Sequence, residues 1–233
     1  MDIIEISYCF ILGKQRREVF NLRLNANNIT LIDESFCDLP EWTHLEFHQC
    51  VHCPLSSETH SNCPVAVSLA NVIERFDNVV SYDEIDLEVI TNERHVSQHT
   101  TAQRGLSSLL GLLFATSGCP HTDFLKPMAC FHLPLASEEE TIFRAAGMYL
   151  LAQYFLKQDG KQSDLELVGL KQMYDDLHVI NTMIAKRLKS TVSTDSSVNA
   201  VILLDMFTNL MPFVIDDHLD EIRNLFNAYF SDI

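Results

Sequence analysis

The sequence has few of the residues that characterise fibrous, low-complexity or membrane-spanning chains. Glycine and proline occur only 7 times each among 233 residues, which excludes collagen-like and linker-rich chains. No uninterrupted apolar run approaches the roughly 20 residues that a membrane-spanning helix needs. Positive charge is also scarce, with 16 basic residues against 32 acidic ones and a formal charge of -16. A nucleic acid would have to bind against that negative field, so we expect neither a nucleic-acid nor a membrane partner.

The N-terminal residues lack the order of a secretory signal. Asp2 and Glu5 precede the first apolar stretch and a basic cluster follows it, whereas a signal peptide begins with basic residues and ends at a small-residue cleavage site. We therefore expect a cytoplasmic protein. In a reducing compartment the seven cysteines, an odd number, favour metal or redox chemistry over a disulfide framework.

Hydrophobic patterning predicts an α+β fold. Apolar and β-branched runs predict strands over 3–12, 17–24 and 29–32, with asparagines at the second turn, a further strand over 42–47, and a later pair over 85–90 and 95–98. Helical periodicity and capping residues predict six helices. They are expected over 64–76, from a cap at Thr100 or Thr101 to near Gly118, from the capping pair Ser137 and Glu140 to about Lys157, from a similar pair Ser163 and Glu166 through Leu188, from Asp195 to near Pro212, and from Asp216 through Tyr229.

The order of these elements places an N-terminal antiparallel β-meander before a mainly helical C-terminal half. We expect residues 1–157 to hold the sheet, the first helices and the cysteine and histidine motifs, and residues 163–233 to form a helical layer. The polar segment 158–163 is the best linker between them. It is short, and a single compact domain accounts for the pattern equally well.

The strongest chemical signal is the stretch FHQCVHCPLSSETHSNCP, residues 47–64. It places Cys50 and Cys53 in a C-x-x-C pair, with Cys63 ten residues further on and histidines between them. Thiolates at this spacing recur in zinc and iron–sulfur sites, because a tight turn points both to one side. The later stretch SGCPHT supplies Cys119 and His121. We therefore predict that Cys50, Cys53 and Cys63 bind zinc, with Cys119 or His121 as the fourth ligand.

Three of the cysteines precede a proline, and Cys63-Pro64 reads as the start of a helix, where a thiolate faces free N–H groups. Elsewhere a lone cysteine is more often a core residue. We assign Cys9, Cys37 and Cys130 to the core and His132 to a structural hydrogen bond. The alternative for the motif cysteines is an iron–sulfur cluster or a reactive dithiol.

A second candidate site lies at the expected start of the helix near residue 101. Thr101, Gln103 and Arg104 combine a hydroxyl, an amide and a guanidinium with free backbone N–H groups, a set that can border a small-ligand pocket. Asp175, Asp176 and the nearby His178 are assigned to a solvated helix face. The sequence contains no glycine-rich phosphate loop, no G-x-S-x-G elbow and no H-E-x-x-H motif. It identifies no catalytic residue.

The stretches CPL, NCPVAVSLANVIERF, TTAQRGLSSLLGLLFATSGCPHT and FHLPLASEEETIFRAAGMYLLAQYF resemble a bacterial family of uncharacterised proteins. The resemblance covers about residues 50–155. It carries over no activity, since none is established for the family. It does imply that the motif cysteines belong with TTAQRG and SGCPHT in one site.

Together these features predict a cytoplasmic metal-binding protein with a regulatory or interaction role, acting on a protein or small-molecule partner. A redox enzyme or sensor that uses the same cysteines is the first alternative. A helical adaptor with structural cysteines is the second. The aliphatic positions of the last helices fit either a monomer core or a homodimer interface.

Overall fold

The computed structural model describes residues 2–13, 16–32, 38–192, 195–215 and 219–230. Its architecture is α+β, with an antiparallel sheet at the N-terminus and a helical C-terminal half, as the hydrophobic patterning predicts. No described helix has both the length and the apolar character needed to cross a membrane.

Five antiparallel strands form one sheet in the order β3-β2-β1-β4-β5. They are β1 (Ile3–Leu12), β2 (Arg16–Asn25), β3 (Thr30–Leu31), β4 (Glu84–Ile90) and β5 (His95–Thr101). The predicted meander β1-β2-β3 is confirmed, and the later hairpin joins the free side of β1. The central strand β1 alternates strictly, with Ile6, Tyr8 and Phe10 buried on one face. An antiparallel sheet of this kind packs one face on the core and leaves the other in solvent.

The prediction of a strand over 42–47 is wrong. The chain instead forms a single 3₁₀ turn, η1 (Glu41–Thr43), followed by one isolated bridge between His44 and Asn62. Pro40 has the fixed φ of proline, and its carbonyl accepts hydrogen bonds from both the N–H and the hydroxyl of Thr43. These bonds coil the backbone before a strand can extend.

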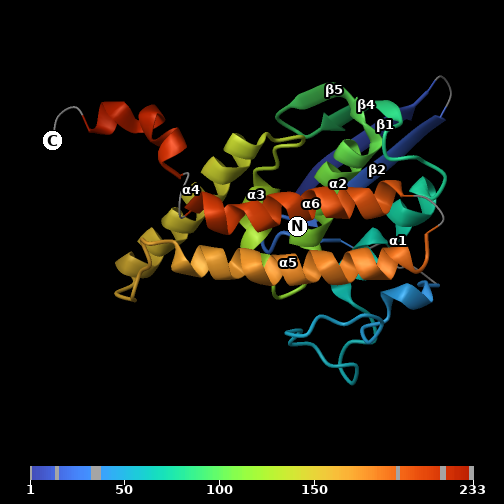
Figure 1. The fold of residues 1–233 in the computed structure, drawn as a ribbon, viewed down its shortest axis with the longest axis horizontal. Helices are drawn as coiled ribbons and strands as arrows, with labels where there is room; N and C mark the ends of the chain where they lie inside the picture. Colours follow the sequence, from blue (N-terminus) through green and yellow to red (C-terminus); the bar gives the residue numbers. More distant parts are fainter. Residues whose placement is uncertain (1, 14–15, 33–37, 193–194, 216–218, 231–233) are drawn as a thin grey trace.

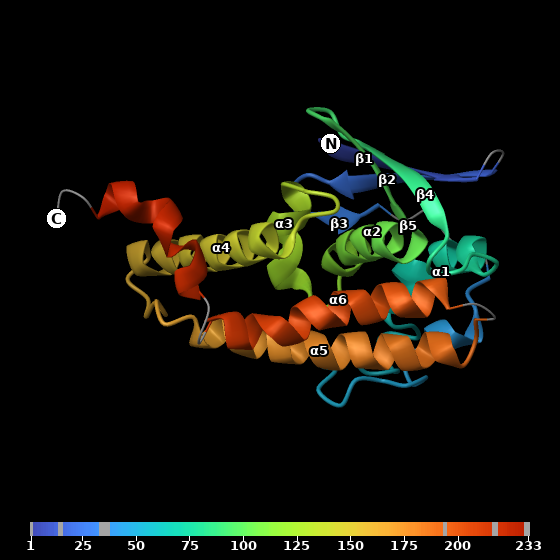
Figure 2. The same ribbon diagram turned by 45° about the horizontal axis from the view of Figure 1, so that its top comes forward.

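The helices lie in layers beneath the sheet, as Figure 2 shows. Directly under it are α1 (Pro64–Phe76) and α2 (Ala102–Thr116), and farther out are α6 (Ser196–Phe213) and α5 (Val168–Lys189), which run side by side in Figure 1. The short η2 (Asp123–Leu125) and α3 (Lys126–Cys130) lead from α2 to α4 (Glu138–Gln158). The segment η4 (Leu219–Tyr229) is a 3₁₀ helix; the predicted start at Asp216 lies outside the described residues.

Two predicted helix starts had different outcomes. The capping box of α4 is present: the Ser137 hydroxyl accepts from Glu140 N, and the Glu140 carboxylate accepts from Ser137 N. The capping pair predicted for α5 is wrong. That helix begins later, at Val168, and Asp164 accepts the bonds from the backbone N–H groups of Glu166 and Gly169. Asp164 is itself a good capping residue, and it lies closer to the helix than Ser163.

The buried side chains form one cluster that includes both halves of the sequence. Phe10 on β1 and Leu106 on α2 belong to it together with Leu170, Ile184 and Val201 on α5 and α6. The helix α2 is buried nearly all round, because the sheet covers one side and α6 the other. This burial positions the end of α2, where the second cysteine motif begins.

Candidate metal centre

The first cysteine motif lies on a loop whose ends are joined. Residues 44–62 leave η1 and return to α1, and two backbone bonds close the base of this loop: Leu45 N donates to Ser61 O (3.0 Å) and Cys63 N to Thr43 O (2.8 Å). Within it, Cys53 N donates to Cys50 O (3.1 Å), which forms the tight turn expected of a C-x-x-C pair. Cys63 is the N-cap of α1, and Pro64 occupies its first position, as predicted.

The second motif follows α2. Gly118 has a φ of 83°, a conformation that favours glycine, and turns the chain so that Cys119 lies back against the core. The Thr122 hydroxyl then donates to Phe114 O (2.7 Å) and holds the turn to the end of the helix.

The structure brings the four predicted thiols together. Cys50, Cys53, Cys63 and Cys119 line one small cavity of about 20 Å³, and His121 also lies on its wall. They come from the loop, from the start of α1 and from the turn after α2. The remaining walls are largely apolar and come from Leu45, Leu55, Pro64 and one face of α5. No described cysteine is in a disulfide.

A buried arginine that the sequence analysis missed supports this arrangement. Arg187 on α5 is only 2% exposed and donates to the carbonyl oxygens of Trp42 and His44 (both 2.6 Å) and of Leu45 (2.9 Å). It therefore fixes the start of the cysteine loop to α5, and it lines the cysteine cavity. In the sequence it looks like any basic residue in the last turn of a helix, so no local signal could have identified it.

Burial and mutual proximity change the ionisation of the thiols. Burial, with smaller contributions from Cys63, Cys119 and Cys53, raises the pKa of Cys50 to about 12. Burial likewise raises the pKa of Cys119 to about 11. Without a bound cation Cys50 and Cys119 are protonated at neutral pH, chiefly because burial disfavours the charged thiolate. A metal ion reverses this preference, since only the thiolate is a ligand.

The spacing of the sulfurs bears on which metal they suit. Among the described residues, no three of the four thiol sulfurs lie within 4.8 Å of one another. A single zinc ion bonds each sulfur at about 2.3 Å, which places tetrahedral sulfurs about 4 Å apart. The sulfurs must therefore move closer together to bind zinc.

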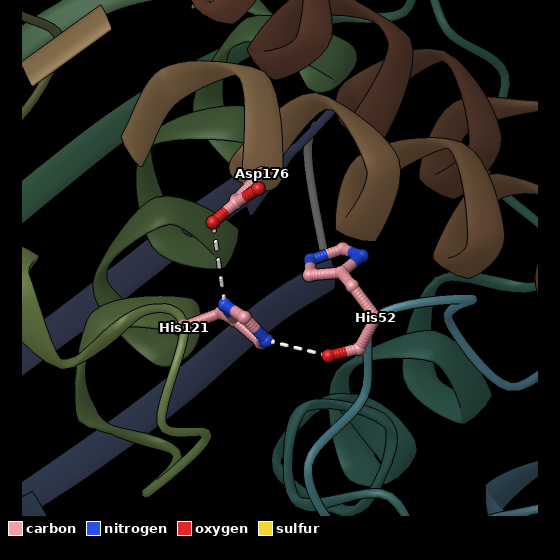
Figure 3. Close-up of side chains that lie close together, drawn as sticks. All are labelled: His52, His121 and Asp176. Carbon is pink, nitrogen blue, oxygen red and sulfur yellow. Dashed lines mark hydrogen bonds and ion pairs between the residues drawn. The ribbon is translucent and has the colours of Figure 1, made fainter. Parts of the chain in front are cut away.

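A group of different chemistry lies beside the thiols, at His52, His121 and Asp176 (Figure 3). One ligand atom from each lies within 4.8 Å of the other two. His121 Nε2 donates to the His52 carbonyl (2.9 Å), so its Nδ1 faces a carboxylate oxygen of Asp176 at 3.6 Å. The Nε2 atom of His52 is buried and has no hydrogen-bond partner. Two imidazoles and a carboxylate are a common ligand set for zinc or iron.

The assignment of Asp176 to a solvated face is corrected by this contact, because α5 packs over the turn that carries His121. Its neighbour His178 instead pairs with Asp205 on α6 (2.8 Å). The side chain of Asp176 is still partly exposed, so only the position of α5 distinguishes it from an ordinary surface carboxylate.

The predicted residues near the start of α2 are separated in the structure. Of the two predicted caps, Thr100 and Thr101, the N-cap of α2 is Thr101, and its side chain makes no capping bond. Arg104 lines a large cavity, while the lining of that cavity does not include Thr101 or Gln103. Of the cysteines assigned to the core, Cys9 and Cys130 are half-buried, and Cys37 lies outside the described residues.

Comparison with known proteins assigns the family. A family model described as a domain of unknown function (DUF6901) matches residues 6–227. The chain belongs to this family. The match extends well beyond residues 50–155 and includes the sheet, the cysteine motifs and the helical half. No curated protein and no solved structure matches the chain. Functional inference therefore rests on the geometry of the sites.

Proposed function

We propose that the protein is a redox protein whose Cys50, Cys53, Cys63 and Cys119 bind an iron–sulfur cluster of the four-iron type. The convergence of these four thiols on one small cavity carries the proposal. A cluster of this type is held by four thiolates, and its irons and sulfides keep the four cysteine sulfurs farther apart than a single zinc ion does. No three of these four described thiol sulfurs lie within 4.8 Å of one another, which favours the wider ligand spacing of the cluster, and the cavity of about 20 Å³ must widen to admit it.

The surroundings of the thiols support the same assignment. The apolar wall from α5 limits access of water, and the buried Arg187 places a fixed positive charge beside ligands that are negative when they bind metal. A nearby cation and a set of buried surroundings are among the features that set the potential of a cluster. When bound, the cluster supplies one-electron transfer. Electron transfer or redox sensing is the role that we infer.

Metal analysis of protein purified without oxygen or chelator tests the proposal. We expect about four irons and four sulfides per chain, with broad visible absorption. The variant Cys53→Ser should lose most of the iron and most of the visible absorption. Its matched control is Cys130→Ser, because Cys130 is also half-buried but lies on α3 and not on the cysteine cavity. The control should keep the iron and the colour.

Other results would change the assignment. About one zinc per chain, colourless and lost in Cys53→Ser, would identify the zinc site predicted from the sequence and remove the redox role. No metal in the wild-type chain would refute a metal centre at these cysteines. If the Cys53→Ser and Cys130→Ser variants lose the same amount of metal, the loss reflects general destabilisation of the protein. That result would contradict the specific role of Cys53.

The second candidate is a single metal ion at His52, His121 and Asp176, favoured by the unpartnered His52 Nε2. The substitution Asp176→Asn separates the two candidates. It removes an anionic ligand from this group and leaves all four cysteines intact. If the metal content falls in Asp176→Asn and persists in Cys53→Ser, the histidine and aspartate group holds the ion.

A further inference from the structure

A second, much larger cavity lies between the helices. Its volume is about 480 Å³, and its walls come from α2, α3, α4, α5 and α6. This size falls in the range of small-molecule sites. Most of its lining is apolar, including Leu112 on α2, Leu177 on α5 and Phe207 on α6. A cavity with such walls favours a ligand with an apolar body.

One side of the cavity carries a partly buried chain of polar groups. His132 Nε2 and the hydroxyl of Tyr8 are 2.5 Å apart, and that hydroxyl is 3.0 Å from Ser108 Oγ. Ser108 Oγ also accepts a bond from Leu135 N (3.1 Å). Leu135 has a φ of 56°, which is unfavourable for leucine. The backbone is thus held in a rare conformation where it meets this network, a feature that concentrates at ligand sites.

Two arginines face the same cavity, Arg104 from α2 and Arg144 from α4. Arg104 lies one helical turn before Ser108, and Arg144 lies near enough to His132 to lower its pKa. Both arginines thus line the cavity near residues of the hydrogen-bond chain from Ser108 to His132. His132 itself is neutral at neutral pH, because burial, with Arg144 and Arg94, lowers its pKa to about 3.

Neither arginine makes an ion pair within the described part of the chain, although Glu140, one turn before Arg144 on α4, interacts with it electrostatically. Arg144 donates only to the carbonyl oxygens of Met128 and Phe131, at 2.9 and 3.0 Å. Arg104 has no hydrogen-bond or ion-pair partner among the described residues. Glu138 also lines the cavity, but its exposed side chain pairs with neither arginine. Arg104 is exposed and Arg144 is half-buried, and in a chain with twice as many acidic as basic residues two such cations at one cavity favour an anionic ligand.

We propose that this cavity binds an amphipathic organic anion, a carboxylate with an apolar body. The carboxylate is held by Arg104 and Arg144, which can each donate two parallel hydrogen bonds to it. The apolar body lies against Leu112, Leu177 and Phe207. The site is separate from the cysteine centre and does not depend on which metal binds there. The two cavities are neighbours, since Leu177 lines this one and Ile180, on the next turn of α5, lines the cysteine cavity.

Calorimetry with the full chain tests the charge of the ligand. The probes are decanoate, 4-phenylbutyrate and the neutral analogue decanol. We expect one of the two acids to bind at least about tenfold more tightly than decanol, because a charge-assisted hydrogen bond contributes more than a neutral one. Preference for decanoate identifies an acyl chain, and preference for 4-phenylbutyrate identifies an aromatic acid. Binding of decanol as tightly as both acids, or no binding of either acid, would overturn the proposal.

Variants locate the ligand. Arg144→Gln and Arg104→Gln should each weaken binding of the preferred acid by about tenfold or more and leave decanol unchanged. Arg17→Gln is the matched control, since Arg17 is exposed on β2 and is not part of the cavity. Gly111→Leu should weaken binding of acid and alcohol alike, because Gly111 lines the cavity and an added Cβ has ordinary contact with Leu204 at 3.4 Å, so the larger side chain takes up cavity space. Thermal melting confirms that each variant is folded. Unchanged acid binding in both arginine variants would refute the site.

Discussion

Arg187 offers the sharpest test of how the cysteine loop is held. In the variant Arg187→Met a side chain of similar length remains, but the three bonds to the carbonyl oxygens of Trp42, His44 and Leu45 are lost. A buried carbonyl left without a donor costs roughly 1–3 kcal/mol. Part of the summed cost of the three unsatisfied carbonyls is offset, because the variant no longer buries a charge. We therefore expect the free energy of unfolding to fall by about 3–5 kcal/mol.

Urea unfolding measures this loss directly. The chain has a single tryptophan, Trp42, which is buried and whose own carbonyl accepts one of the three bonds. Its fluorescence therefore reports the element that Arg187 holds. The variant Arg187→Lys is the control, because it keeps the positive charge but cannot donate to all three carbonyls. Its stability should lie between those of the wild type and of Arg187→Met. If the proposed metal centre is occupied, it should also lose its metal faster in Arg187→Met than in the wild type.

A decrease in unfolding free energy below about 1 kcal/mol in Arg187→Met would refute this account, because surface substitutions typically have effects of that size. It would mean that the loop keeps its position through other contacts. Equal stabilities of the methionine and lysine variants would show that the hydrogen-bond geometry matters and the charge does not.

Two further predictions concern packing and pH. Gly105→Ala should destabilise the protein by about 1–3 kcal/mol, since its added Cβ would lie 2.9 Å from Ile85 Cδ1 and 3.1 Å from Phe10 Cε1. Gly147→Ala, whose added Cβ has nothing within 4 Å, should stabilise α4 by up to about 1 kcal/mol. Melting temperatures that rank the two variants in the opposite order would contradict this prediction. His132 has a folded pKa of about 3, below its ordinary 6.5, so the unfolded chain binds a proton first and stability should be lost as pH falls from about 6.5 toward 3. Urea titrations should show a shallower loss over that range in His132→Gln, and an identical slope would contradict the assignment.

Local patterns in the sequence determined most of the elements. Alternation in β1 and β2, Pro64 after Cys63 and the capping box at Ser137 each act over a few residues, so they are visible without the fold. The strand expected over 42–47 failed because the carbonyl of Pro40 bonds back to Thr43. The start of α5 failed because two capping residues, Ser163 and Asp164, compete at neighbouring positions, and the chain uses the one nearer the helix.

The candidate site likewise has features that the sequence predicted and features that only the fold decided. The short spacing of Cys50 and Cys53 predicted a metal motif, and the sequence grouped Cys63 and Cys119 with them as candidate ligands. Only the tertiary structure decided that all four share one cavity, that Arg187 lies beside them, and that Asp176 faces His121. It also showed that Arg104 and Arg144 line a single cavity, although the helix that carries Arg144 begins more than thirty residues later. These are contacts between residues far apart in the chain, which depend on how the helices pack on the sheet, and no local pattern encodes them.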